Sequence, residues 1–426
     1  MARSPNRGAV RRARIAELIN YNNEYDEYLT LISRLHGLTI HSNHSKRSRI
    51  GRKGNKHRDR AWGEARINEL SDKHFTRMFR LDRVSFNDLL QKVSTILSEK
   101  NEQKAIYSSG SCINNFCRLA MTLRWLAGAS YLDLCQLYQV DNSTFYAEDG
   151  ILWPTMEAIN QAVPLKFPTN DPNDPNYNPV ELAQVASDFS TFSNNFFTSL
   201  VGAIDGLVIR TRCPFRTEVT NQREYRNRKG CFGVLCLGVS DIRGKFLSFS
   251  SNWTGSTHDS HAWNTSSLYY NFFYNKIRGF HLIGDEAFSN TEFLLSPWPG
   301  RSIGVWKDSF NYQLSHSRQC IERAFGMLVQ RFGVLQRRLI VSKRRWSLVA
   351  VVCAKLHNIC IDRNIQHLPR LFEDVHREDD IEPIYNDNND TDRAERATGT
   401  LRSRLTQALE LMSKRRPQFA SCNSRA

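Results

Sequence analysis

The 426-residue chain lacks the long apolar runs of a membrane protein. No stretch of about 18 consecutive apolar residues occurs, which argues against a transmembrane helix. The N-terminal residues are basic but include no apolar segment of the kind found in secretory signals. The ten cysteines include no CxxC pair and no zinc-finger spacing. These absences predict a folded intracellular protein with reduced thiols and no membrane partner.

Acidic charge is scarce in two regions of the chain. Residues 1–60 hold 14 Lys and Arg against 5 Asp and Glu, and residues 301–350 hold 10 against 2, within a net charge of +15. Residues 371–392 have the opposite sign, with 9 acidic residues and one arginine. Separated basic regions are typical of proteins that bind a polyanion, because phosphate contacts supply most non-specific affinity for nucleic acid. A merely soluble basic surface is the alternative.

Composition divides the chain into four parts. Residues 1–60 predict a flexible basic arm that grips DNA, directs the chain to the nucleus or serves as a tether. Residues 71–165 carry apolar side chains at helical spacing and predict an all-α domain. Residues 180–362 alternate strand-like and helical segments, which predicts a mixed α/β domain. Residues 363–426 form a polar acidic tail.

One segment of the all-α domain has the pattern of a helix-turn-helix. A helix over SYLDLCQLYQV precedes a short turn and a second helix, and Ser130 and Asp141 are good N-cap residues for the two. DNA reading by residues 141–150 is one interpretation of this pattern, and a helix pair that only packs is the other.

Local patterns predict several elements of the α/β domain. VGAIDGLVIRT and GFHLIGDEAF each contain a short buried strand, and FGVLCLGVSDIRGKFLSFSSNW predicts a hairpin that turns at residues 241–244. A helix capped at Ser256 or Thr257 follows the hairpin. Residues 311–362 predict two helices that separate near residues 333–343.

Four acidic residues of this domain lie in apolar or glycine-rich surroundings. Asp205 and Asp285 end strand-like runs, Asp259 lies at a helix start, and Glu322 lies inside a helix. Carboxylates are rarely buried without compensation, and a divalent cation is a common one. Two Mg²⁺ or Mn²⁺ ions held by carboxylates can activate an attacking oxygen and neutralise charge on the phosphorus. On a basic chain, the pattern predicts metal-dependent phosphodiester chemistry.

Each of these four residues also has a structural interpretation. Asp205 and Asp285 are next to glycines and could be turn residues. Glu322 could pair with Arg318, four residues earlier on the same helix face. Asp259 could cap a helix or occupy its first turn, where negative charge is favoured. The two histidines that flank Asp259 would suit Zn²⁺ better than Mg²⁺.

Basic residues around these carboxylates are candidates for contacts with DNA phosphates. A solvated helix face is the alternative for those in the helix of Glu322. The candidates are Arg228, Lys229, Arg318, Arg323 and Arg331, with the cluster 343–345 in addition.

The motifs GAIDG, NRKGCFGVLCLGVSD, NWTGSTHDS, LIGDEAF, IERAFGMLVQRF and KLHNICI occur in an order that resembles PIF/Harbinger-type DDE transposases and their host-derived relatives. The resemblance covers about residues 75–362. It implies an RNase H-like mixed-sheet nuclease domain preceded by an all-α helix-turn-helix domain. It also implies that Asp205, Asp285 and Glu322 are catalytic metal ligands, with Asp259 as a further ligand.

The chain departs from the family pattern at two places. Leu207–Val208 stand where the family often has Thr-His, and Glu286–Ala287–Phe288 stand where it often has Ser-Gly-Tyr. Neither change removes a carboxylate, but both alter the surroundings of the predicted site.

Two functions follow as the main expectations, with a structural assembly protein as a third. The first is a Mg²⁺- or Mn²⁺-dependent DNA endonuclease and strand transferase. The second is a domesticated protein that binds DNA or a partner with weak or no catalysis. The resemblance further implies a homodimer and a separate Myb-like DNA-binding partner, and the basic segment 46–60 predicts a location in the nucleus.

Overall fold

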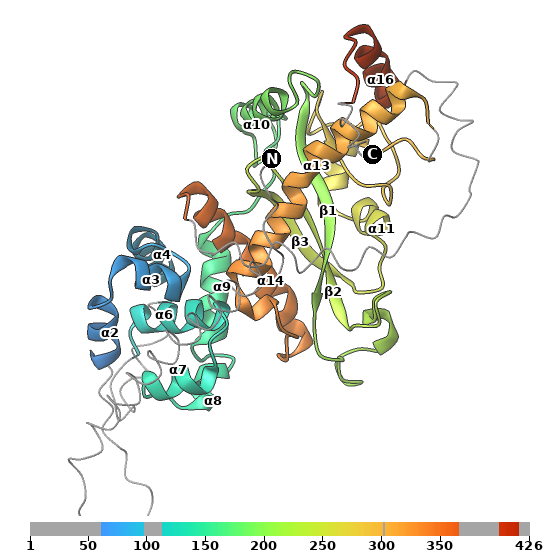
Figure 1. Cartoon of the computed structure of the whole chain (residues 1–426). Helices are drawn as coiled ribbons and strands as arrows, with labels where there is room; N and C mark the ends of the chain where they lie inside the picture. The colour runs from blue at the N-terminus through green and yellow to red at the C-terminus, as the bar shows by residue number, and fades with distance from the viewer. Residues whose placement is uncertain (1–60, 98–112, 301–302, 366–399, 417–426) are drawn as a thin grey trace, which may run out of the picture. The chain divides into compact units, whose positions relative to one another are not determined.

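The computed structural model describes four stretches of the chain, residues 61–97, 113–300, 303–365 and 400–416. The predicted basic arm and the acidic stretch of the tail lie outside these residues. Within the described part, helices come first along the chain, and a sheet with helices packed on it follows (Figure 1). All of the described residues belong to one compact unit.

The N-terminal part of the described chain is entirely helical. Several of its helices begin at polar N-caps whose side chains accept a backbone hydrogen bond, as where the Asn114 side chain accepts one from the Cys117 amide. Phe75, Phe79 and Phe86 make mutual ring contacts in its core. The helices are α2 (Ala61–Asn68), α3 (Asp72–Phe79), α4 (Arg83–Leu97), α6 (Asn115–Leu126), α7 (Tyr131–Leu137), α8 (Asn142–Tyr146) and α9 (Leu152–Ala162).

Helices α7 and α8 form the pair that the sequence suggested as a helix-turn-helix. Ser130 and Asp141 are their N-caps, as predicted. Helix α8, however, has only five residues, and residues 130–150 contain four acidic side chains and no Lys or Arg. Lysine and arginine supply most of the affinity for DNA phosphates, and this segment has neither. The predicted helix-turn-helix DNA-binding domain is therefore not confirmed.

A five-stranded mixed sheet is the centre of the second part. The strand order is β3-β2-β1-β4-β5, with β1, β2 and β3 antiparallel and β4 and β5 parallel to β1. The mixed α/β class is confirmed, and the sheet is consistent with an RNase H-like domain. The strands are β1 (Leu200–Arg210), β2 (Gly233–Ser240), β3 (Phe246–Thr254), β4 (His281–Ile283) and β5 (Leu294–Leu295).

The predicted hairpin is formed by β2 and β3. All eight residues of β2 are buried, which explains its continuous apolar run. Gly244 has a φ of +87° in the turn, a backbone conformation that few residues other than glycine adopt. The Asp241 carboxylate accepts hydrogen bonds from the amides of Arg243 and Lys245 and so closes the same turn.

Helices pack against the strands of the sheet. Helix α13 crosses β1 and β2, and α14 packs on β3, whereas α10 contacts β1 (Figure 1). The gap predicted between the last two long helices is confirmed, because η3 (Gly333–Leu335) and a loop separate them. The helices of this part are α10 (Pro179–Phe192), α11 (Asp259–Asn264), α12 (Ser267–Phe273), α13 (Val305–Arg331) and α14 (Lys343–Asp362).

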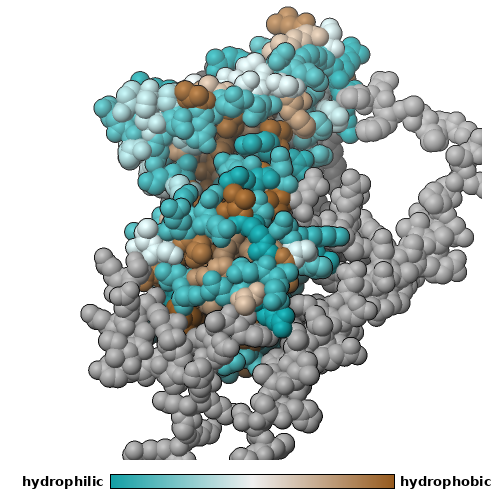
Figure 2. All heavy atoms as spheres, turned by 90° about the vertical axis from the view of Figure 1, so that its left-hand side faces the viewer, coloured by the Kyte–Doolittle hydropathy of each residue, from teal (hydrophilic) through white to brown (hydrophobic). Residues whose placement is uncertain are grey.

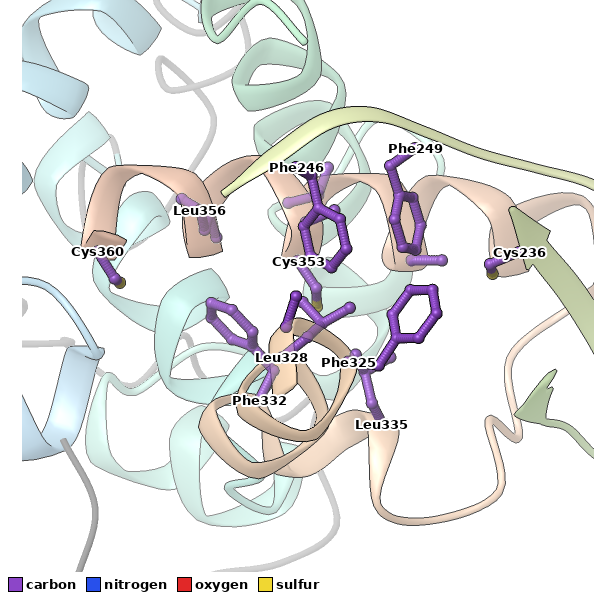
Figure 3. Packing of buried hydrophobic residues seen from close by; sticks show 14 of the residues in the cluster. Cys236, Phe246, Phe249, Phe325, Leu328, Phe332, Leu335, Cys353, Leu356 and Cys360 are labelled. Atoms are coloured by element: carbon purple, nitrogen blue, oxygen red, sulfur yellow. The ribbon is translucent and has the colours of Figure 1, made fainter. Parts of the chain in front are cut away.

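Aromatic and sulfur side chains fill the space between α13, α14 and β3. Figure 3 shows Phe325 and Leu328 of α13 directed toward Phe246 of β3 and Cys353 of α14. The rings of Phe246 and Phe325 lie 5.7 Å apart between centroids. This packing holds α13, and with it Glu322, against the sheet.

A further helix, α16 (Leu401–Leu411), packs against α13, although the sequence analysis assigned its residues to a polar acidic tail. The guanidinium of Arg402 lies 4.0 Å from the centroid of the Trp298 ring, and Trp298 Nε1 donates a hydrogen bond to Thr406 Oγ1. Leu409 is completely buried. Part of the predicted tail thus belongs to the folded structure.

The described surface is mostly hydrophilic on the face drawn in Figure 2, with apolar side chains in separate small groups. Among the described helices, none is both long and apolar enough to cross a membrane.

Candidate active site

Strand β1 carries the first predicted carboxylate into the centre of the sheet. Its residues from Leu200 to Ile204 are buried, and Asp205 is the first polar residue of the strand, opposite Gly238 of β2. The Asp205 side chain is 18% exposed. Its Oδ1 accepts a hydrogen bond from the Gly206 amide at 2.8 Å. Asp205 is therefore a strand residue and not the turn residue that its neighbouring glycine allowed.

Asp285 follows the neighbouring parallel strand, β4. The register aligns Ala203 of β1 with Ile283 of β4, so Asp205 and Asp285 each lie two residues further in the same direction. Asp285 also closes a turn, because its Oδ1 accepts a hydrogen bond from the Ala287 amide at 3.0 Å. The parallel pairing of β1 and β4 thus brings these two carboxylates to the same region of the sheet.

Burial and mutual repulsion make the negative charge of Asp205 unfavourable. Burial raises the pKa of Asp205 to about 7, and the negative charge of Asp285 adds to the rise. The positive charge of Arg318 and the Gly206 amide act in the opposite direction, whereas Asp259 raises the pKa slightly further. Asp205 is thus a buried carboxyl group whose ionised form needs a cation nearby.

Asp259 reaches the same strand because residue 206 is a glycine. A Cβ added at Gly206 would lie 2.3 Å from Oδ1 of Asp259, so the carboxylate occupies the space that any other side chain would need. Neighbouring residues of a strand point to opposite faces. Asp259 therefore approaches β1 from the face opposite the one on which Asp205 meets Arg318.

The first turn of α11 holds Asp259 in this place. The N-cap of α11 is His258, and its side chain makes no capping hydrogen bond, so the predicted caps Ser256 and Thr257 are wrong. Burial raises the pKa of Asp259, and the charge of Asp285 adds to the rise, whereas Arg228 and His258 oppose it. Asp285 therefore interacts electrostatically with both Asp205 and Asp259.

Glu322 is connected to the other carboxylates through an arginine. Arg318 lies one turn earlier on α13, and its Nη2 is 2.6 Å from Oε1 of Glu322. Nη1 of the same side chain is 3.4 Å from Oδ2 of Asp205. The Glu322 side chain is 51% exposed, whereas that of Arg318 is 20% exposed. The helical ion pair that the spacing allowed is present, and it extends to Asp205.

The chemistry of these donors fits a hard divalent cation. Asp205 and Asp285 supply carboxylate oxygens, which are the ligands that Mg²⁺ and Mn²⁺ prefer. A bound cation would also relieve the repulsion between the two carboxylates. Within the described stretches, no three His, Cys, Asp or Glu side chains lie close enough to hold one metal ion as they stand. Arg318 accounts for part of this arrangement, because it holds Glu322 by an ion pair.

The basic residues predicted to contact DNA have different environments. Arg228 and Lys229 are exposed in the loop before β2, and Arg228 faces the charge of Asp259. Arg323 is exposed, and its Nη2 donates a hydrogen bond to the Ile242 carbonyl at 2.7 Å. These placements leave contacts with phosphate open to each of them.

The structure corrects the prediction for Arg331. This residue is 5% exposed, and its guanidinium contacts His357 Nδ1 at 2.8 Å and the Ile365 carbonyl at 3.3 Å. A side chain enclosed in this way joins the end of α13 to α14 and does not face a phosphate backbone.

Two residues of the basic cluster 343–345 are also engaged within the chain. Arg344 and Arg345 both pair with Glu148, and Arg345 Nη1 lies 2.5 Å from Glu157 of α9. The guanidinium of Arg345 also lies 5.0 Å from the centroid of the Trp153 ring. These arginines attach α14 to the helical part of the chain, which the local density of positive charge did not indicate.

Sequence reasoning missed the role of Gly206 and saw that of Arg318 only as an alternative. The glycine after Asp205 was visible in GAIDG, but the contact with Asp259 joins residues 53 positions apart and has no local signal. The spacing of four residues was the available signal for the pair of Arg318 and Glu322.

The region that carries the four acidic residues is similar to known proteins. Residues 204–358, which include all four acidic positions, match the family model described as DDE superfamily endonuclease. The human and mouse proteins named "Putative nuclease HARBI1" are 29% and 30% identical over 171 residues, 39% of this chain and 47% of each relative. The match thus spans about half the length of these curated relatives.

A longer match involves a plant protein. The Arabidopsis thaliana "Protein ALP1-like" is 24% identical over 313 residues, 70% of this chain and 72% of that relative. No solved structure matches the chain significantly. The chain therefore contains a DDE superfamily endonuclease domain over residues 204–358, and its relatives are consistent with the Harbinger type that the motif order predicted.

Proposed function

We propose that the chain is a divalent-metal-dependent DNA endonuclease and strand transferase of the Harbinger type. The observation that carries this proposal is the pair of carboxylates Asp205 and Asp285 at corresponding points of the parallel strands β1 and β4. Burial raises the pKa of Asp205 and the charge on Asp285 adds to the rise, and both residues lie inside the segment that matches DDE superfamily endonucleases. Carboxylates whose pKa is shifted by burial and by a neighbouring charge are typical of functional sites.

Asp205 and Asp285 are the residues that would hold the cation, with Glu322 and Asp259 as further ligands. A bound Mg²⁺ or Mn²⁺ would activate the attacking oxygen and neutralise the charge that develops on the phosphate. Strand β1 fixes Asp205, and α13 presents Glu322 from one side of this strand. Asp259 contacts β1 at Gly206 from the other side.

Exposed basic side chains near the site support DNA as the substrate. Arg228, Lys229 and Arg323 are exposed on segments that adjoin the carboxylates, and the chain carries a net charge of +15. Arginine and lysine contacts with phosphates supply affinity without sequence preference. We propose these three residues as phosphate contacts of the bound DNA.

Nicking of supercoiled plasmid tests the proposal. Purified full-length protein is incubated with Mg²⁺, Mn²⁺ or EDTA, beside the variants Asp205→Asn and Asp285→Asn. Loss of a metal ligand should lower nicking by about a hundredfold or more, since even an outer partner of a ligand contributes 10–100-fold. Asp188→Asn is the matched control, because the half-buried Asp188 of α10 accepts a hydrogen bond from Gln184 of the same helix.

Circular dichroism of each variant separates loss of chemistry from loss of folding. Metal-dependent nicking that survives in Asp205→Asn and Asp285→Asn would rule out the proposal.

A second candidate function is favoured by the ion pairs of Arg318. A protein that has lost catalysis and only binds DNA or a partner would keep Glu322 engaged with Arg318, as it is in this structure. The melting temperature discriminates the two functions. A metal-binding site should raise the melting temperature with Mn²⁺, and Asp285→Asn should remove the rise.

Location and assembly complete the proposal. We propose a nuclear protein that acts as a homodimer, since strand transfer joins two DNA ends, and that works with a Myb-like DNA-binding partner. The absence of basic residues from 130–150 supports a need for this partner, because α7 and α8 then lack the Lys and Arg contacts that would position them on DNA. Specific binding of a transposon-end DNA by the purified chain alone would contradict it.

A further inference from the structure

Arg318 is placed between the two elements that carry predicted metal ligands. It contacts Asp205 of β1 through Nη1 and Glu322 of α13 through Nη2, at 3.4 Å and 2.6 Å. The side chain is 20% exposed, so solvent screens these contacts less than it screens surface ion pairs. One guanidinium thus pairs with two carboxylates, one of them on a strand 113 residues before it in the chain and the other four residues after it on the same helix.

The charge balance of the site depends on this residue. Asp205 is buried beside Asp285, and Arg318 is the nearest opposing charge that stabilises the ionised form of Asp205. The ion pairs that the described residues make with Asp205 and Glu322 both come from Arg318. Arg318 therefore performs the neutralisation that a divalent cation would perform at the same oxygens.

The guanidinium of Arg318 and a divalent metal ion compete for the same carboxylate oxygens. Each binds the lone pairs of Asp205 Oδ2 and Glu322 Oε1, and two positive charges at this distance repel each other. We propose that Arg318 is a positioning residue that holds Asp205 and Glu322 in the metal-free protein and is displaced from them when the divalent cation binds. This inference rests on the proposed function, because it concerns the same metal site.

The displaced side chain has a second partner of matching chemistry. A guanidinium presents a fixed fork of donors that fits the oxygens of a phosphate group. Released from the carboxylates, Arg318 remains on α13 beside the site and turns to a phosphate of the bound DNA. Metal and DNA thereby favour the same displaced state of Arg318, which couples their binding.

The test compares Mn²⁺ binding by the full-length chain and by Arg318→Gln in the absence of DNA. Isothermal titration calorimetry should show that the variant binds Mn²⁺ more tightly by roughly fivefold or more, the lower range of coupling between two ligands of one site. Arg318→Lys keeps the charge but not the fork of donors, so its affinity for Mn²⁺ should lie between those of the unaltered protein and of Arg318→Gln. Arg363→Gln, which removes an exposed arginine paired with Asp88, is the control for loss of an ion pair elsewhere.

Thermal denaturation gives a second readout that does not depend on catalysis. In EDTA, Arg318→Gln should melt at a lower temperature than the unaltered protein, because Asp205 and Glu322 lose their counter-cation. Saturating Mn²⁺ should raise the melting temperature of the variant more than that of the unaltered protein. A purely structural ion pair would lower the melting temperature in EDTA but would leave Mn²⁺ affinity unchanged.

The outcomes separate this inference from the proposed function. Mn²⁺ binding by the unaltered protein with no gain in Arg318→Gln overturns the inference and leaves the metal site standing. Binding by the variant alone shows that Arg318 keeps the unaltered chain free of metal, which overturns the displacement of Arg318 by the cation and contradicts the proposed activity of that chain. Binding by neither protein overturns both.

Discussion

The smallest residue of the site has a large influence on its geometry. Gly206 leaves room for the Asp259 carboxylate against β1, and a Cβ at this position would lie 2.3 Å from Oδ1 and 2.6 Å from Cγ of Asp259. Real Cβ atoms do not approach other atoms so closely, so the Asp259 side chain would have to move away from β1. The approach of Asp259 to the sheet therefore depends on the absence of a single methyl group.

Substitution of Gly206 by alanine tests this dependence. Gly206→Ala should displace Asp259, lower metal-dependent nicking by at least about tenfold, and destabilise the fold by about 1–3 kcal/mol through overpacking. Gly326→Ala is the matched control, because a Cβ at this position of α13 meets nothing within 4 Å. Removal of glycine from a helix interior should stabilise the control by up to about 1 kcal/mol. Full nicking by Gly206→Ala would show that the position of Asp259 is not required.

The candidate site was predictable in its residue types but not in its contacts. Asp205 and Asp285 were predicted from short apolar runs that end in an acidic residue, and the structure brings both into electrostatic contact. The position of Asp259 against Gly206 depends on how α11 packs on the sheet, which no local pattern encodes. Their roles as metal ligands stay predictions.

At the scale of elements, α14 is attached to the hairpin by an amide side chain. Asn358 Oδ1 accepts a hydrogen bond from the Phe246 amide at 2.8 Å, and its Nδ2 donates one to the Phe246 carbonyl at 2.7 Å. His357, the preceding residue, contacts the Gly244 carbonyl through Nε2 at 2.9 Å. The sequence HN in α14 thus satisfies backbone groups at the start of β3 that a neighbouring strand would otherwise have to satisfy.

Removal of the Asn358 side chain should therefore be costly. In Asn358→Ala the amide and the carbonyl of Phe246 stay buried without their partners, and the free energy of unfolding should fall by about 2–4 kcal/mol. Urea denaturation followed by circular dichroism measures the loss. Asn264→Ala removes the same group from the exposed end of α11 and should change stability by less than about 0.5 kcal/mol. Equal stability of the two variants would refute the bracing role of Asn358.

Elements with a local hydrophobic pattern were predictable, whereas those that depend on distant partners were not. Strands β1 and β2 have largely apolar runs, and β3 follows β2 after a turn signal, so the sequence indicated them. Helix α16 was missed because polar side chains make part of its contacts, such as Arg402 on Trp298, beside the buried Leu409. Such a contact gives no period in the sequence of either partner.

At the scale of the whole molecule, the basic charge is only partly available to DNA. The density of Lys and Arg over 301–350 predicted phosphate contacts along this segment. In the structure Arg331 is buried, and Arg345 pairs with Glu148 and Glu157 of the helical part. Net charge reports the attraction of the molecule for a polyanion, but the acidic partners that engage individual arginines can be identified only in the folded chain.

Buried histidines make the stability of the whole molecule depend on pH. Burial lowers the pKa of His281 of β4 to about 4, and no described group forms a hydrogen bond with its Nε2. An unfolded chain binds a proton at this histidine near pH 6.5, whereas the folded chain does so only near pH 4. The contribution of neutral His281 to the free energy of unfolding is therefore fully present above about pH 6.5 and is lost as the pH falls toward 4.

Denaturation of His281→Leu at two pH values isolates the contribution of His281 to the free energy of unfolding. Other groups also contribute to the pH dependence; the raised pKa of Asp205, for example, acts in the opposite direction. Between pH 7.5 and 4.5, proton uptake by unfolded His281 should lower the free energy of unfolding of the unaltered chain by roughly 2.5 kcal/mol. The leucine variant has no proton to bind, so its acid sensitivity should be smaller by this amount. His261→Leu, at an exposed position of α11, should keep the acid sensitivity of the unaltered chain. An equal fall in all three proteins would mean that His281 is not protected from protonation in the folded state.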